Sequence, residues 1–459
     1  MSNIGYRARW AVATALLLAL PVTACNDIKD ELLDPQNPGL IDPTQVNSAD
    51  AADALRIGAL GQLKSNTAGG ETLWLYGGLI TDEWKSSDTF LQRNETDQRT
   101  IQTNNANISS AYSGIQQARG YIRDAIEQMT KYLPDAKGNI GELYFALGFL
   151  EMQMAEDLCN GIPLGLSRNG VIDYTDPGYK PLTDAEVYTK AAAHLDTAVT
   201  MAGQQTDAHS VAVKQAALIA KARVLVDQGQ FSAAAAAVPA SAVPTSYQYL
   251  LTFAQTSGDN GLWSLNTNQG RYTVADSNDV LTGAIKNALP FISAKDPRVP
   301  VTDAKKKGFD GQTNLFTFGV ARGDPMPLVS GIDARLIEAE AKLNANDIAG
   351  MMTILNGLRT SAQTLGTIKV SALSSLATPA SQDAATTLFF REKAFWTFGR
   401  GQRLGDERRQ VRQYKRSQDQ VFPVGAFFKN GAYGSDVNLP VTDSEKTNPN
   451  FHGCIDRSA

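Results

Sequence analysis

The sequence predicts a mainly α-helical protein of stacked helical hairpins, interrupted by long irregular insertions. Three observations predict it. Apolar residues recur at helical spacing along most of the chain, alternating strand patterns are few and short, and two segments share one helix-turn-helix pattern. Hydrophobic residues make up 43% of the 459 residues, which is enough for a sizeable core.

The composition excludes several classes of protein. The net charge of −5 argues against a nucleic-acid-binding protein, which usually carries a basic surplus. Three cysteines and three histidines are too few for a Cys/His zinc module, and no histidine stands at a metal-ligand spacing. We therefore expect no metal, no cofactor, no nucleic-acid partner and no catalytic histidine.

The N-terminus has the pattern of a secretory signal. Arg7 and Arg9 precede an apolar stretch over residues 10–20, which is too short to span a bilayer. It ends in Val22-Thr23-Ala24-Cys25, which resembles a bacterial lipobox, where cleavage precedes a cysteine that carries the lipid. We expect residues 1–24 to be a lipoprotein signal peptide and Cys25 to be the lipid anchor. A plain signal peptide with an incidental cysteine is the alternative.

Residues 25–48 are predicted to hold the anchor and a tether, because they are polar and turn-rich. Within them, Lys29-Asp30-Glu31 resembles the surface-export signals of some outer-membrane lipoproteins. We expect the mature protein to be held at a membrane surface by the lipid alone.

Apolar stripes at spacings of three and four residues predict five helices with one face on the core. They cover residues 115–129, 143–154, 188–199, 213–224 and 332–343. Residues 160–183, 239–330 and 417–459 show little periodicity, which indicates functional loops or a second subdomain. The best strand pattern is over residues 262–265.

Two helical segments resemble each other at an offset of 117 residues, from Ala222 to Ala339. Gly229 and Asn346 occupy equivalent positions, and both residue types tolerate the left-handed conformation that ends a helix. The unit resembles the hairpin of tetratricopeptide repeats, which stack to bury a shared core. The alternative is two unrelated hairpins. The repeat favours a single domain over residues 49–459.

Four motifs follow one another along the chain. They are residues 141–149 with Gly161-Ile162-Pro163-Leu164, residues 335–341 with 355–359, residues 401–406 with Arg409, and Phe422-Pro423 with Glu445 and Asn448-Pro449-Asn450. With these motifs in this order after a lipobox, the chain resembles the SusD/RagB family of nutrient-uptake outer-membrane lipoproteins. The resemblance covers nearly the whole mature chain. Phe390-Arg391 and Arg400-Gly401 depart from it, since the family often has Glu-Arg and Glu-Gly there.

The resemblance implies one domain of tetratricopeptide-like hairpins whose irregular insertions form a ligand-binding surface. It implies a binding protein, and no enzyme, that is lipid-anchored at the cell outer membrane and faces the exterior. There it captures a glycan or oligosaccharide nutrient for a SusC-like TonB-dependent transporter. Two alternatives stay open: capture of peptides by a protein of the same class, and a helical-repeat adaptor that binds only protein.

The charged residues of these motifs are expected to be structural. They lie next to apolar stripe positions, where partly buried Arg–carboxylate pairs fix helix packing. A catalytic charged cluster is the alternative. The residues are Arg335, Glu338, Glu340, Arg403 and Asp406.

Sugar binding needs flat aromatic faces for the C–H side of a ring and polar side chains for the hydroxyl groups. Two segments, near residues 74–93 and 263–272, carry this mixture. Core packing of Trp74 and Trp263 is the alternative. The predicted ligand-binding residues are Trp74, Asp82, Trp84, Arg93, Arg271 and Tyr272.

With Cys25 assigned to lipid, Cys159 and Cys454 remain as an even pair in an exported protein. We predict a disulfide between them that fixes the C-terminal tail to the Gly-x-Pro-Leu loop.

Overall fold

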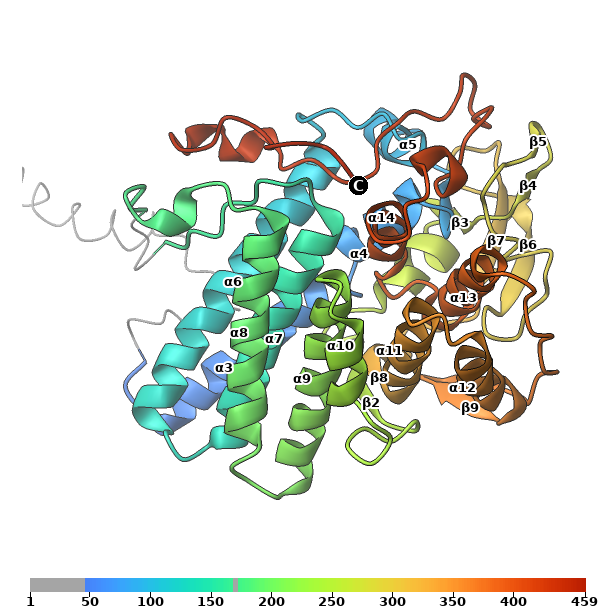
Figure 1. Cartoon of the computed structure of the whole chain (residues 1–459). Helices are drawn as coiled ribbons and strands as arrows, with labels where there is room; N and C mark the ends of the chain where they lie inside the picture. Colours follow the sequence, from blue (N-terminus) through green and yellow to red (C-terminus); the bar gives the residue numbers. More distant parts are fainter. Residues whose placement is uncertain (1–45, 168–171) are drawn as a thin grey trace, which may run out of the picture. The chain divides into compact units, whose positions relative to one another are not determined.

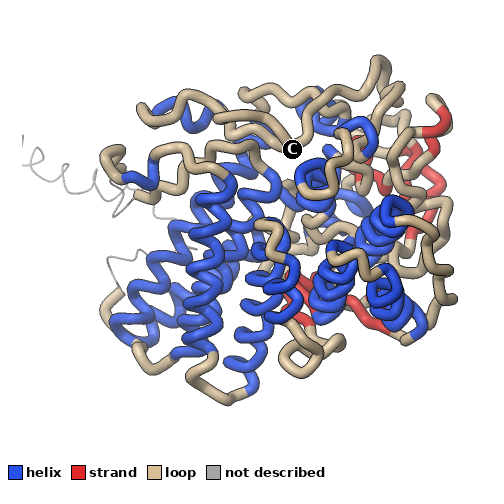
Figure 2. Tube along the Cα trace, viewed as in Figure 1, coloured by secondary structure: helices blue, strands red, loops and turns tan. Residues whose placement is uncertain are grey.

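The structure, a computed structural model, describes residues 46–167 and 172–459, which belong to one compact unit. The predicted signal peptide, the Cys25 anchor and nearly all of the tether lie outside the described residues. Helices dominate the unit, as predicted, and the strands are short (Figures 1 and 2). Within the described ranges, no helix is both long and apolar enough to cross a bilayer.

The helices of the unit pack mostly in chain order, each long helix against the next (Figure 1). Shorter helices fill the other end, where α13 contacts α11, and α14 contacts α4 and α7. The bounds are α3 (Ala49–Ser65), α4 (Leu73–Ile80), α5 (Leu91–Asp97), α6 (Ala106–Tyr132), α7 (Lys137–Asp157), α8 (Asp184–Ala202), α9 (Ala208–Asp227), α10 (Phe231–Ala237), α11 (Gly331–Asn344), α12 (Ile348–Thr360), α13 (Gln382–Thr397) and α14 (Arg403–Arg412).

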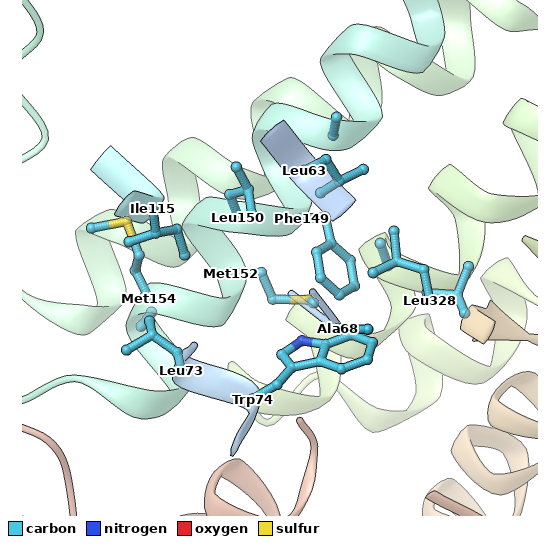
Figure 3. Close-up of a cluster of buried hydrophobic side chains, with 14 of the residues drawn as sticks. Leu63, Ala68, Leu73, Trp74, Ile115, Phe149, Leu150, Met152, Met154 and Leu328 are labelled. Carbon is cyan, nitrogen blue, oxygen red and sulfur yellow. The ribbon is translucent and has the colours of Figure 1, made fainter. Parts of the chain in front are cut away.

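The predicted apolar stripes face the core. Every member of the α6 stripe, from Ile115 to Met129, is buried. Helix α7 is buried on nearly all sides, because α3, α6, α8 and α9 all contact it. Phe149 and Met152 of α7 lie beside Trp74 of α4 in this core (Figure 3). The stack therefore has its centre along α7.

The two repeat segments adopt the same hairpin turn. Gly229 after α9 has φ +75°, and Asn346 after α11 has φ +64°. In the first turn Gln230 N–H donates to the Leu225 carbonyl, and in the second Asp347 N–H donates to the Lys342 carbonyl. Both are the long hydrogen bond of a Schellman motif, at equivalent positions. The predicted repeat of helix, turn and helix is confirmed.

In the described part of the chain, the strands pair into five separate two-stranded antiparallel sheets. The pairing of β1 with β3 joins Trp84 to Val274 and so brings two distant segments together. Residues 262–265 form no strand: a π-helix spans Trp263–Asn268, so that expectation is wrong. The bounds are β1 (Trp84–Ser86), β2 (Gln248–Leu251), β3 (Tyr272–Val274), β4 (Asn278–Asp279), β5 (Gly283–Ala284), β6 (Val301–Lys307), β7 (Asn314–Phe318), β8 (Met326–Ser330), β9 (Gln363–Leu365) and β10 (Ile368–Val370).

The charged motif residues join helices in the interior. Arg409 of α14 pairs with Glu340 of α11, and Lys393 of α13 lies 2.6 Å from Asp406 of α14. Burial opposes ionisation of Asp406, but Lys393 and Arg409 together hold its pKa below the ordinary value. Arg403 joins α14 to the segment between α4 and β1, since its Nε lies 2.6 Å from Asp82 Oδ1.

At the other end of α11, Arg335 Nε lies 2.8 Å from Glu338 Oε2. Arg400, one of the departures from the family pattern, is also buried and binds Asp333 at 2.6 Å. Asp333 belongs to the capping box of α11 with Ser330. An arginine at position 400 therefore supports the start of that helix.

Cys159 and Cys454 form the predicted disulfide. Cys159 is fully buried directly after α7, and its N–H donates to the Leu439 carbonyl at 2.8 Å. An isolated antiparallel β-bridge between Asn160 and Asp456 extends the contact between the two segments. The C-terminal tail is thus fixed across the end of α7, beside the Gly-x-Pro-Leu loop.

Candidate functional site

Four of the predicted ligand-binding side chains lie in the interior. Trp74 Nε1 donates to Gln153 Oε1 at 3.1 Å within the core, and Trp84 packs on Phe398 with ring centroids 5.0 Å apart. A ligand at the surface does not reach these groups, which corrects the expectation. The four are Trp74, Asp82, Trp84 and Tyr272, each exposed by 2% or less.

Arg93 and Arg271 lie nearer the surface and share one network of ion pairs. Arg93 Nε and Nη2 donate to the Glu71 carboxylate at 2.6 and 2.8 Å, and Tyr272 Oη donates to the same group at 2.7 Å. Asp88 Oδ2 accepts from Arg271 Nη1 at 2.6 Å and from Arg93 Nη1 at 3.2 Å. Since both guanidinium groups have carboxylate partners, they fix the segment after β1 against β3.

This network supports two exposed aromatic rings that the sequence analysis missed. Phe90 is 55% exposed and Phe309 is 49% exposed. The Arg271 guanidinium carbon lies 4.1 Å from the ring centroid of Phe309 and 5.6 Å from that of Phe90. Arg93 approaches Phe90 at 4.8 Å. The predicted arginines therefore position aromatic faces at the surface through cation–π contacts.

A cavity of about 740 Å³ lies in the same region, and its lining includes Thr89 and Asp310, the chain neighbours of Phe90 and Phe309. Residues of β1, β3, the β4–β5 hairpin, the β6–β7 hairpin and the segment 428–430 line it. These strands gather at one end of the unit, away from the long helices α6 to α9 (Figures 1 and 2). The volume is within the ~300–1,000 Å³ range of small-molecule sites. We take this cavity as the candidate binding site.

Ion pairs across the cavity hold its walls in place. Lys85 of β1 pairs with Asp279 of β4, and its Nζ lies 3.8 Å from the centroid of the Phe428 ring. Lys429 Nζ lies 2.9 Å from Asp310 Oδ2. Burial opposes ionisation of Asp310, but hydrogen bonds from Thr313 together with Lys429 lower its pKa to about 2. The walls are therefore built from charges that already have partners.

A buried carboxyl group lies behind the cavity. Asp97 Oδ2 accepts a hydrogen bond from Ser86 N–H at 2.6 Å, next to the lining residue Lys85. Burial raises the pKa of Asp97 to about 7. As for metals, no set of three or more His, Cys, Asp or Glu in the described parts of the chain is arranged to hold an ion.

Comparisons with known proteins identify the fold. No family model and no curated protein matches the sequence. A solved SusD homolog from Bacteroides thetaiotaomicron superposes with a TM-score of 0.61 at 12% identity, over 92% of this chain and 99% of its own. A SusD-like protein from Bacteroides fragilis gives 0.61 at 13% identity, over 88% and 96%. A laminarin-binding SusD-like protein gives 0.60 at 13% identity, over 89% and 100%. The chain has the SusD-like fold, as the resemblance predicted.

Proposed function

We propose that this chain, which has the fold of the SusD-like proteins, is a cell-surface lipoprotein of the SusD/RagB type that captures oligosaccharides. Cys25 holds it to the outer membrane through lipid, and the cavity between the β4–β5 and β6–β7 hairpins receives the ligand. The ligand then passes to a SusC-like TonB-dependent transporter. The protein acts by binding and not by catalysis.

The cavity is the observation that supports the proposal most directly. It combines apolar side chains with amide and hydroxyl groups, which suits a molecule with a C–H face and many hydroxyl groups. Its place in a SusD-like fold adds to the argument, because one neighbour of that fold binds laminarin. The lipobox and the polar tether support the location.

Calorimetric titration tests the binding. Wild-type protein is titrated with laminari-, cello- and malto-oligosaccharides, and so are two variants. Asn278→Ala removes an exposed amide of the cavity wall, and Gln117→Ala removes an exposed amide of α6 as the matched control. We expect Asn278→Ala to weaken binding about tenfold, the usual effect of one lost hydrogen bond in a binding site, and Gln117→Ala to leave it unchanged. Absence of binding for every sugar would overturn the proposal.

The location has a separate test. Cells expressing wild type and Cys25→Ala are labelled with a fatty-acid analogue, and intact cells are treated with protease. We expect label only in the wild type, and wild-type protein that is digested from outside. Label in both proteins would contradict the lipid anchor, and protection of the wild type would contradict surface exposure.

Delivery to the transporter is tested by co-purification. We expect a TonB-dependent β-barrel encoded beside this protein to purify with it from detergent-solubilised outer membranes. Tight binding of the barrel without binding of any sugar would favour the protein-only adaptor. Binding of short peptides in place of sugars would favour the peptide-capturing alternative.

A further inference from the structure

The cavity has one wall of branched aliphatic side chains. Val274, Ile285 and Ile292 line it together with Val280 and Leu281 at the tip of the β4–β5 hairpin. The two tip residues are 83% and 76% exposed, the highest values among the large apolar residues of the described chain. Branched aliphatic groups are rounded, so they pack better against methyl groups than against the flat face of a sugar ring.

The exposed tip is held in a fixed place. Asp279 Oδ1 accepts hydrogen bonds from Leu281 N–H at 2.8 Å and from Thr282 N–H at 3.3 Å, and Asp279 also pairs with Lys85 of β1. Val280 and Leu281 therefore face the cavity because the hairpin is anchored there. A ligand that covers them removes apolar surface from water.

The same lining also carries amide groups, and Asn278 is only two residues from Val280 on the β4–β5 hairpin. The side chains of Asn278, Gln312 and Asn430 are exposed, and none of the three makes a hydrogen bond within residues 46–167 and 172–459. Each amide group has both a donor and an acceptor, which is the complement of an amide in a ligand. Hydroxyl groups also fit them, but they supply no methyl group for the aliphatic wall.

The charges of the lining cancel. Asp279 and Asp310 pair with lysines, and Asp88 pairs with two arginines. Lys307 and Asp276 remain without an ion-pair partner in the described chain, and they have opposite signs. Such a cavity has no surplus of either sign to attract a polyanionic or polycationic chain. The lining fits a neutral ligand.

From these three observations we infer that the cavity selects a neutral oligosaccharide that carries N-acetyl groups. The acetyl methyl group packs against Val280, Leu281 and Ile292, and the amide of the same group binds the unpartnered Asn and Gln side chains. The half-buried Phe316 supplies the flat face for the sugar ring. This inference rests on the proposed function and names its ligand class.

Matched trimers test it in calorimetric titrations. Tri-N-acetylchitotriose and cellotriose have the same β-1,4-linked backbone and differ in the group on C2, which is N-acetyl in one and hydroxyl in the other. We expect the acetylated trimer to bind about tenfold tighter, as one buried methyl group and one amide hydrogen bond together provide. Chitotriose, which carries ammonium groups, is expected to bind no better than cellotriose.

Two variants test whether the β4–β5 hairpin causes the preference for the acetylated trimer over cellotriose. Val280→Ser combined with Leu281→Ser is expected to bring the affinities for the acetylated trimer and cellotriose together. Ile57→Ser changes an exposed apolar residue of α3, outside the cavity lining, and is expected to keep the preference. Equal wild-type affinities for the two trimers would overturn this inference and leave oligosaccharide capture standing. Binding of acetylated tripeptides with no binding of any sugar would overturn both.

Discussion

Glu83 is a fully buried carboxyl group at the junction between the N-terminal segment and α13. Its Oε1 accepts a hydrogen bond from Gly399 N–H at 3.0 Å, while the neighbouring Asp82 takes the partner Arg403. Burial raises the pKa of Glu83 to about 8, against the opposing effects of the Gly399 N–H and Arg403. The side chain is therefore protonated in the folded protein at neutral pH.

This proton makes stability depend on pH. An unfolded glutamate titrates near pH ~4.3, so between that value and about pH 8 the folded state holds a proton that the unfolded state releases. The contribution of Glu83 to stability is thus fully present below about pH 4.3, falls as the pH rises, and is completely lost above about pH 8. Glu83→Gln stays neutral and is expected to gain stability relative to wild type between about pH 5 and pH 9, on the order of a few kcal/mol.

Urea unfolding across this pH range measures the difference. Glu127→Gln removes an exposed carboxyl group of α6 and serves as the control. A constant difference between Glu83→Gln and wild type at every pH would show that Glu83 is ionised in the folded protein, and the prediction would then be wrong.

Single residues were the hardest feature to predict from the sequence. Trp74 and Trp84 satisfy the chemistry of a sugar platform, but a large aromatic side chain satisfies a core position equally well. Only the packing of α7 and α14 against α4, which carries Trp74, shows that this side chain belongs to the core and not to a sugar platform. Phe90 and Phe309 are both in contact with Arg271, which directly precedes β3, and no local sequence pattern predicts a contact between residues so far apart.

The hairpin turns after α9 and α11 show how the repeat is encoded at the level of elements. Each turn needs one residue with positive φ, which Gly229 supplies without strain and Asn346 supplies with little. Their equivalence was visible in the sequence because turn chemistry and apolar spacing are both local. The π-helix at Trp263–Asn268 was not visible, because its short apolar alternation also fits a strand.

Two glycine substitutions test the role of the turn. Gly229→Ala is expected to destabilise the protein by about 1 kcal/mol, since a methyl group opposes the left-handed backbone although no atom lies within 4 Å of it. Gly120→Ala in the middle of α6 also places its methyl group in open space and is expected to stabilise by about 0.5–1 kcal/mol. Thermal unfolding should shift in opposite directions, and a shift of the same sign in both would contradict the turn argument.

At the scale of the whole molecule, the mainly helical fold could be predicted because three kinds of evidence agree. They are the apolar stripes, the helix-turn-helix repeat and the order of the motifs along the chain. The cavity could not, since it is assembled from five segments between residues 85 and 430 whose pairing is non-local. The disulfide could be predicted because only two cysteines remain after the lipid anchor is assigned.

The disulfide joins residues 295 positions apart, so it restricts most of the unfolded chain. The chain-entropy model gives about 6 kcal/mol for a closed loop of this size, before any strain. Cys454→Ser is expected to unfold at a lower temperature than wild type, and reductant is expected to lower the wild-type transition to meet it. Equal transitions for both proteins without reductant would show that the bond does not form. Cys454 is the better site to change, because Cys159 is fully buried.

The buried tryptophans have a consequence for spectroscopy. Trp74, Trp84 and Trp396 are each exposed by 2% or less, and Trp263 lies on the π-helix outside the lining of the cavity. The aromatic residues that line the cavity are phenylalanines, which absorb and emit weakly. Intrinsic tryptophan emission will therefore change when the core unfolds and will not change when a ligand binds in the cavity. A fluorescence titration of ligand binding thus needs a fluorophore attached near the β4–β5 hairpin.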